Sequence, residues 1–266
     1  MLLYLLQNYM VKISVIINTY NEERYIERCL KNLLWADEII IIDMYSSDNT
    51  VNIAKKYTKN IYFHKREISV LYARNFSLTK ANYNWVFIVD PDEIVPFELV
   101  NKLKEVAENN LYDAVSIPFQ LFFLNRPLYY AYPITHKIRF FKKNVANFPK
   151  RVHSQPIING NILTLEVIDD YIVKHYSVDT IGSFLKKILR YTKDEARHKF
   201  FSDNIKFNLY KLIKAPIAEF YYRFFVNKGF RDGFLGFVFC IFMSIYNFLI
   251  YFRLFFIQYL NGERKS

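Results

Sequence analysis

Residues 13–23, ISVIINTYNEE, begin with a continuous run of residues typical of β-strands, mostly β-branched and apolar, and end in a polar turn. Such a run is typical of a parallel strand buried on both faces, so we predict a strand over 11–18 and a helix over 21–34. The alternation continues to about residue 117, with strands predicted over 38–42, 61–63 and 85–89 and helices over 50–57, 69–81 and 96–109. This order predicts an α/β fold, a mainly parallel sheet with helices on both faces.

The composition of the 266-residue chain excludes several classes of protein. A hydrophobic content of 52% is too high for a disordered chain, and 6 glycines exclude a collagen-like sequence. Cys29 and Cys240 are the only cysteines, which excludes a disulfide scaffold. The first ten residues are apolar but have no basic leader and no small-residue cleavage site, so we expect no signal peptide.

Two carboxylates, Asp90 and Asp92, follow the strand predicted over 85–89 in the sequence Asp-Pro-Asp-Glu. Ligands of open α/β sheets bind beyond the carboxyl ends of the strands, where Asp43 also lies. Carboxylates two residues apart on a turn can converge on Mg²⁺ or Mn²⁺ and leave positions open for phosphate oxygens. The pattern therefore predicts a metal site, with a solvated acidic turn as the alternative.

Four motifs in this order resemble family 2 glycosyltransferases of the GT-A fold. They are residues 13–23, Asp43 with the following Ser46-Ser47-Asp48 and Thr50, Ala73-Arg74-Asn75, and residues 90–93. The chain departs from the family pattern at Asn18, where a proline is usual. Proline shapes the backbone there and does not react, so the departure changes little.

The resemblance implies a Rossmann-like GT-A domain that binds a nucleotide-diphospho-sugar, UDP-linked in most relatives. The turn that carries Thr19, Tyr20 and Glu22 would cradle the nucleotide. Asp43 would accept a hydrogen bond from the base, with a strand-end cap as the alternative. Arg74 would lie near the nucleotide or its phosphates.

The resemblance also implies metal ligands. Asp90 would contact the ribose and the metal, and Asp92 would bind the metal, Mn²⁺ or Mg²⁺. In many GT-A enzymes a late histidine completes the metal site, and an imidazole suits Mn²⁺. His175 is the candidate here, and the alternative is a structural histidine at a strand end.

Several segments of the second half resemble one branch of the family, which contains lipopolysaccharide-core β-1,4-glucosyltransferases. They are residues 122–126, 137–143, 152–153, 175–177 and 228–233. Members of this branch carry Val-His-Glu, in which the glutamate is the expected general base of an inverting transfer. This chain has Val152-His153-Ser154, and serine is not a base. We expect His153, whose unperturbed pKa lies near working pH, or Glu93 to act instead; otherwise the activity is reduced or altered.

The stretch 137–151 is basic and has no acidic residue. A basic run of this kind predicts one of two things. It is either a solvated face, or a patch that binds an acidic or phosphorylated acceptor or the diphosphate leaving group. The basic side chains are Lys137, Arg139, Lys142, Lys143, Lys150 and Arg151.

The C-terminal region is basic, aromatic and then apolar. Residues 174–231 hold 13 Lys/Arg against 5 Asp/Glu with many interleaved aromatics, which suits an anionic membrane surface. No nucleic-acid motif accompanies them, so we expect no nucleic-acid partner. Residues 234–252 carry no charge and are just long enough to span a bilayer, but aromatic side chains prefer its interfaces. An interfacial or re-entrant helix pair, a single span and a soluble core helix are the three interpretations.

These expectations combine into one hypothesis. A GT-A catalytic domain covers 1–178, with a nucleotide-sugar half over 11–117 and an acceptor half over 118–178. A helical, membrane-associated arm covers 179–266, at the cytoplasmic face of the membrane. The protein is expected to be a metal-dependent, inverting hexosyltransferase that moves a sugar to a hydroxyl of a lipid-attached cell-surface glycan such as lipopolysaccharide core. The alternatives are a polyprenyl-phosphate acceptor, which requires no base, and a non-catalytic member that binds nucleotide or glycan.

Overall fold

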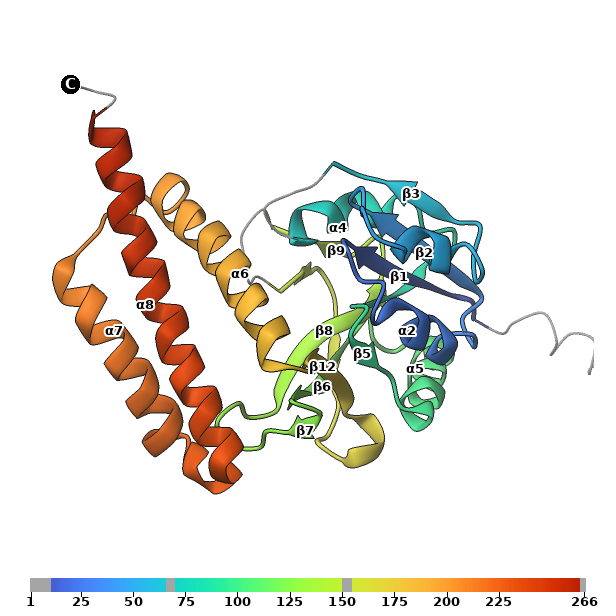
Figure 1. Ribbon diagram of the computed structural model, residues 1–266. Coiled ribbons are helices and arrows are strands. Elements are labelled where there is room, and N and C mark those ends of the chain that lie inside the picture. The colour runs from blue at the N-terminus through green and yellow to red at the C-terminus, as the bar shows by residue number, and fades with distance from the viewer. Residues whose placement is uncertain (1–10, 66–69, 150–154, 264–266) are drawn as a thin grey trace, which may run out of the picture. The chain divides into compact units, whose positions relative to one another are not determined.

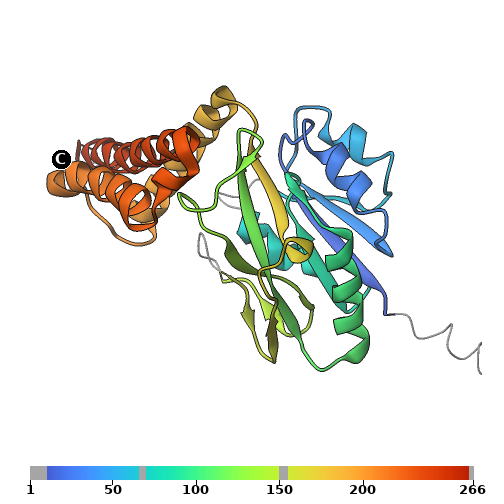
Figure 2. The ribbon, with the colours of Figure 1, turned by 90° about the horizontal axis from the view of Figure 1, so that it is seen from below.

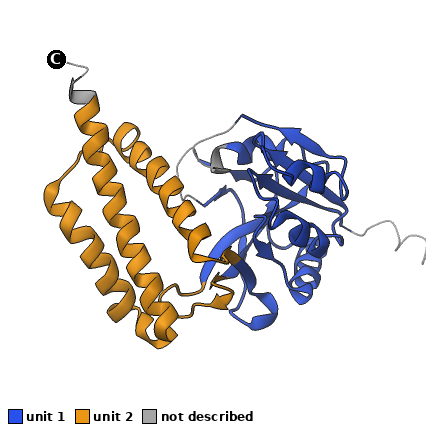
Figure 3. Cartoon of the chain, viewed as in Figure 1, with its two compact units in different colours: residues 1–119, 135–175 blue, residues 120–134, 176–266 orange. Residues whose placement is uncertain are grey.

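The computed structural model describes residues 11–65, 70–149 and 155–263, and these form parts of two compact units (Figure 3). Unit 1 comprises residues 1–119 and 135–175, and unit 2 comprises residues 120–134 and 176–266. The predicted functional division into a catalytic domain over 1–178 and an arm over 179–266 stays a prediction.

The centre of unit 1 is a parallel sheet whose strands follow the order β3-β2-β1-β4 (Figure 1). The strands are β1 (Ile13–Thr19), β2 (Glu38–Asp43), β3 (Ile61–Phe63) and β4 (Trp85–Val89). Every residue of β1, β2 and β4 is buried, as expected for strands covered on both faces. Because β2 and β4 lie on opposite sides of β1, the strand order reverses there, and such a switch point is where open α/β sheets bind ligands.

Antiparallel strands extend this sheet beyond β4. The path continues through β8 (Thr135–Lys142), β6 (Ala114–Phe123) and β12 (Val173–Val178) to β5 (Glu93–Ile94). The pairing of β12 with β5 places His175 opposite Glu93. The remaining short elements are β7 (Arg126–Pro127), β9 (Ala146–Asn147), β10 (Ile157–Ile158), β11 (Ile162–Thr164) and the 3-10 turn η1 (Asp169–Tyr171).

Helices cover both faces of the parallel strands, as their alternating side chains require. On one face Val15 and Ile17 pack with residues of α2 (Ile26–Asn32), α3 (Thr50–Ala54) and α5 (Phe97–Asn109). On the other face Ile16 packs with residues of α4 (Val70–Leu78). The predicted two-sided α/β architecture is therefore confirmed.

Unit 2 contains three long helices, α6 (Ile181–Phe201), α7 (Leu209–Tyr221) and α8 (Gly233–Glu263). The turns η2 (Tyr222–Val226) and η3 (Gly229–Asp232) join α7 to α8, and these two helices run side by side (Figure 2). Asp232 explains one of the resemblance motifs, because its carboxylate accepts the backbone N–H groups of Tyr129, Tyr130 and Ala131 at 2.7–3.0 Å. The segment 228–233 thus tethers the 120–134 segment to the start of α8.

Helices α7 and α8 leave apolar side chains exposed along one face each, because these residues recur every three or four positions. The exposed fraction runs from 37% at Ile241 to 77% at Phe234. We call this the α7–α8 apolar face; it comprises Tyr210, Ile213, Ile217, Tyr221, Phe234, Phe237, Ile241, Ile245, Phe248, Phe252, Phe255, Phe256 and Tyr259. Within the described residues one helical stretch, Gly229–Leu260, is long and apolar enough to cross a membrane, with a mean hydropathy of 2.1 over its best window.

Candidate active site

Two loops at the carboxyl ends of β1 and β2 are joined by hydrogen bonds. Asp43 is fully buried, and its carboxylate accepts the Thr19 hydroxyl at 2.8 Å and the Ser46 hydroxyl at 2.6 Å. The backbone N–H groups of residues 21–23 donate to the side chains of Ser46, Thr50 and Asp48 in turn. The loop after β2 therefore fixes the backbone of the turn that is predicted to hold the nucleotide.

This arrangement accounts for a later helix start than predicted. Asn21 adopts a positive φ of 56°, and its N–H and those of the next two residues are bound by the 46–50 loop. Helix α2 begins only at Ile26, whose N–H donates to the carbonyl of Glu22 at 2.9 Å. Both carboxylate oxygens of Asp43 accept hydrogen bonds from Ser46 of this loop. This is the geometry expected of a strand-end cap. A contact between Asp43 and a base stays a prediction, as do the roles of Tyr20 and Glu22.

Asp90, directly after β4, lies between two buried arginines. Arg139 of β8 approaches Asp90 with 2.6 Å between Nη2 and Oδ2, and Arg74 of α4 with 3.2 Å between Nη2 and Oδ1. The two arginine side chains are only 7% and 8% exposed, whereas that of Asp90 is 26% exposed. The Asp90 carboxylate is therefore the most accessible group of this cluster, and the two arginine side chains that pair with it are buried.

The Glu93 side chain is hydrogen-bonded to the backbone of the same turn. Its Oε2 accepts the backbone N–H of Asp90 at 2.8 Å, and its Oε1 has no hydrogen-bond partner. Two cations face this carboxylate, Lys137 at 3.8 Å and Arg139 at 3.6 Å. The Glu93 side chain is 1% exposed, and in this geometry it stabilises the turn. Its role as a general base stays a prediction.

Burial and charge shift the pKa values of this cluster in opposite directions. Burial would raise the pKa of Asp90, but the charges of Arg139 and Arg74 outweigh it and hold that pKa well below its usual range. Burial and the neighbouring Asp90 charge raise the pKa of Glu93. Burial and the Arg139 charge lower the pKa of Arg74 to about 10. Asp90 and the arginines are thus charged at neutral pH, while Glu93 gains a proton more readily than Asp90.

Asp92 and His175 fit a pair of metal ligands. His175 Nε2 lies 3.2 Å from Asp92 Oδ1, although 83 positions separate them in the chain. A carboxylate oxygen and an imidazole nitrogen are suitable donors for Mn²⁺. The third predicted ligand, Asp90, is held by the arginines instead, and the described residues contain no group of three or more His, Cys, Asp or Glu side chains arranged for a metal. When bound at Asp92 and His175, a divalent ion would neutralise charge on a diphosphate.

The segment that precedes His153 is attached to α4. Asn75 donates from Nδ2 to the carbonyl of Phe148 at 2.8 Å and accepts the N–H of Phe148 at 2.9 Å. The Phe148 ring also lies 5.5 Å from the Arg74 guanidinium. His153 and Arg151 themselves lie outside the described residues, so their predicted roles stay predictions.

The structure divides the predicted basic patch. Lys137 and Arg139 lie in the Asp90 and Glu93 cluster, whereas Lys142 pairs with Asp113 at 2.8 Å and Lys143 donates to the carbonyl of Ala81 at 2.8 Å. The division follows from the antiparallel pairing of β8 with β4, which places Lys142 opposite Trp85 at the start of β4 and Arg139 beside Asp90 after its end. The pairing of Arg139 with Asp90 was missed in the sequence, where the only available signal was that 137 and 139 share one face of a strand.

Comparison with known proteins identifies the class to which this site belongs. A family model described as Glycosyl transferase family 2 matches residues 14–161, which is more than half of the chain. The chain therefore belongs to glycosyltransferase family 2, and the predicted family is confirmed.

Two curated relatives illustrate the range of similarity. An uncharacterized glycosyltransferase of Rickettsia typhi is 28% identical over 254 residues, covering 90% of this chain and 85% of the relative. The SPbeta prophage-derived glycosyltransferase SunS of Bacillus subtilis is 30% identical over 163 residues, covering 59% of this chain and 37% of the relative. Among solved structures, S. aureus TarS in complex with UDP-GlcNAc matches with a TM-score of 0.49 and 19% identity over 90% of each chain.

Proposed function

We propose that this transferase moves a sugar from a UDP-linked donor to a hydroxyl group of a lipid-attached glycan, such as lipopolysaccharide core, at the cytoplasmic face of a membrane. One observation carries the donor half of the proposal: directly after β4, Asp90 pairs with Arg74 and Arg139, and Asp92 pairs with His175. The acceptor half rests on the resemblance of the second half of the chain and on the α7–α8 apolar face.

In this proposal the residues of the chain position the donor and stabilise the leaving group. The turn after β1 holds the nucleoside, and Asp90 accepts hydrogen bonds from the ribose. Arg74 and Arg139 supply positive charge to the diphosphate, which develops the largest negative charge in the reaction. The acceptor oxygen forms a bond to the anomeric carbon from the opposite side as the bond to UDP breaks, and the configuration inverts. The acceptor proton passes to His153 or Glu93.

A panel of UDP-, GDP- and dTDP-sugars with Mn²⁺ or Mg²⁺ tests the proposal by slow donor hydrolysis. We expect one UDP-sugar to release UDP, and we expect Asp92→Asn to lower that rate by about 100-fold or more. The matched control is Asp170→Asn, an exposed carboxylate of unit 1 whose loss leaves the rate unchanged. Hydrolysis that needs no Asp92 would contradict the assignment of the site.

Calorimetric binding of UDP separates the remaining cases. Binding without hydrolysis indicates either that an acceptor is required or that the protein is a non-catalytic nucleotide binder. Parallel assays with a polyprenyl phosphate and with a glycan hydroxyl acceptor then separate the two transfer reactions from each other and from the non-catalytic case. Absence of both binding and hydrolysis for every donor would overturn the proposed enzyme activity and favour a non-catalytic protein.

A further inference from the structure

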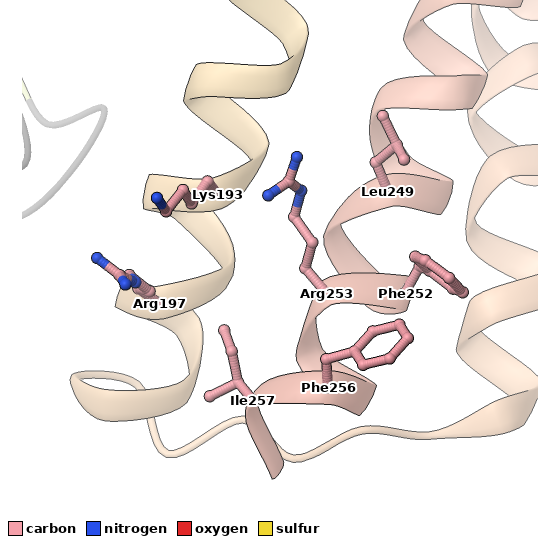
Figure 4. A pocket seen from close by; sticks show the side chains of 7 residues that line it. All are labelled: Lys193, Arg197, Leu249, Phe252, Arg253, Phe256 and Ile257. Carbon is pink, nitrogen blue, oxygen red and sulfur yellow. The ribbon is translucent and has the colours of Figure 1, made fainter. Parts of the chain in front are cut away.

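A pocket of about 380 Å³ lies between α6 and α8 in unit 2 (Figure 4). Lys193 and Arg197 line it from α6, and Arg253 reaches toward α6 from α8. Its apolar lining comes from α8 alone, namely Leu249, Phe252, Phe256 and Ile257. The pocket therefore combines positive charge from two helices with an aromatic and aliphatic wall.

Within the described part of the chain, no ion pair compensates the positive charge of this pocket. Among the described residues, none of the three cations takes part in an ion pair, and the buried Nε of Arg253 has no hydrogen-bond partner. The neighbouring Glu195 of α6 is engaged elsewhere, by the Tyr246 hydroxyl at 2.5 Å and by Lys199 at 3.3 Å. Three cations without an acidic partner favour an anionic group from outside the chain.

Two features of the sequence show that this charge is unusual for its surroundings. Arg253 is the only charged residue between Phe234 and Gly262. On α6 the cations Lys186, Arg190, Lys193 and Arg197 recur every three or four residues and so share one face. Like charges at this spacing repel each other and weaken a helix.

The chemistry of the lining selects the ligand. Arginine binds phosphate through paired N–H donors, and Arg253 reaches toward the α6 cations Lys193 and Arg197 across the pocket (Figure 4). The exposed rings of Phe252 and Phe256, at 41% and 46%, continue from the pocket onto the α7–α8 apolar face, which suits hydrocarbon chains. We propose that this pocket binds the phosphate headgroup of a membrane phospholipid, with its acyl chains along α8. This proposal rests on the membrane attachment proposed above but not on the transfer reaction.

The test uses the full chain and dihexanoyl phosphatidylglycerol kept below its critical micelle concentration, with binding measured by calorimetry. We expect the double variant Arg197→Gln/Arg253→Gln to weaken binding at least 10-fold. The matched control, Lys211→Gln/Lys214→Gln, removes the same charge from exposed positions of α7 and should change binding less than twofold. Circular dichroism checks that both variants keep the helical content of the wild type.

Three results would overturn the proposal. They are no binding of the short-chain lipid by the wild type, equal weakening in the two double variants, and inorganic phosphate that binds as tightly as the lipid, which would indicate a free-anion site. Flotation with phosphatidylcholine vesicles containing phosphatidylglycerol keeps the two proposals apart. A wild type that binds the soluble lipid but does not float would contradict the proposed membrane attachment while supporting a lipid-phosphate site in the pocket.

Discussion

The Asp90 carboxylate forms ion pairs with two residues that lie far from it in the sequence, Arg74 and Arg139. These ion pairs keep Asp90 charged at neutral pH. We expect Arg139→Met to lower donor hydrolysis by about 100-fold, because a charge beside the diphosphate is lost. The unfolding free energy should also fall by about 2–3 kcal/mol, since Asp90 then keeps a single partner. Arg139→Lys keeps the charge but not the paired N–H groups. Its hydrolysis rate and unfolding free energy should lie between those of the wild type and of Arg139→Met.

The control for the two Arg139 variants is Arg126→Met, which removes an exposed arginine of β7. It should leave both the rate and the denaturation midpoint unchanged. Equal rates for Arg139→Met and the wild type would show that Arg139 has only a structural task.

Asn75 is a second residue whose effect is local and measurable. Asn75→Ala removes both hydrogen bonds to the backbone of Phe148, so we expect a loss of about 1–3 kcal/mol of unfolding free energy. Hydrogen exchange at the Phe148 amide should accelerate in the same variant. Asn52→Ala, an exposed change on α3, serves as the control and should alter neither quantity.

At the scale of elements, the two loops after β1 and β2 form one unit whose stability depends on pH. Asp48 is partly buried, which raises its pKa, but hydrogen bonds from Thr50 and from the Glu23 N–H lower the pKa below its usual value. A carboxyl group with a lowered folded-state pKa stabilises the fold fully above its unfolded pKa of about 3.9, and this stabilisation is lost as pH falls through the folded pKa.

Denaturation of the wild type and of Asp48→Asn at pH 7 and between pH 5 and pH 3 tests this dependence. The difference in unfolding free energy between them should be largest at pH 7 and should shrink below about pH 4. Asp170→Asn should show no such trend. A difference that stays constant to pH 3 would mean that the loop contact does not depend on the carboxylate charge.

The sequence predicted the strands better than the helix ends. Strands 61–63 and 85–89 match β3 and β4 at both ends, because unbroken apolar runs bounded by polar turns determine them locally. The start of α2 was predicted too early, because side chains about 25 residues later capture its first N–H groups. For the same reason the pattern identified Asp90 but not its partnership with Arg139, which depends on how β8 pairs with β4.

At the scale of the whole molecule, the α7–α8 apolar face is the feature that the soluble interpretation explains least. Contiguous apolar surface of this extent marks a membrane or protein contact. The opposite side of α8 is buried within unit 2, with Phe239 at 2%, Cys240 at 0% and Leu254 at 0% exposure. A helix with one buried and one exposed apolar side fits a position in the plane of the interface better than a lone span.

We therefore expect the full chain to float with anionic vesicles and to be released by alkaline carbonate, which a spanning helix would resist. Ile245→Glu/Phe252→Glu places two charges on the apolar face, where the side chains are 40% and 41% exposed, and should reduce the floated fraction at least tenfold. Phe97→Glu/Leu111→Glu makes the same change at exposed positions of unit 1 and should leave flotation unchanged. Retention after carbonate treatment would favour a span, and flotation of both double variants alike would exclude α8 as the attachment surface.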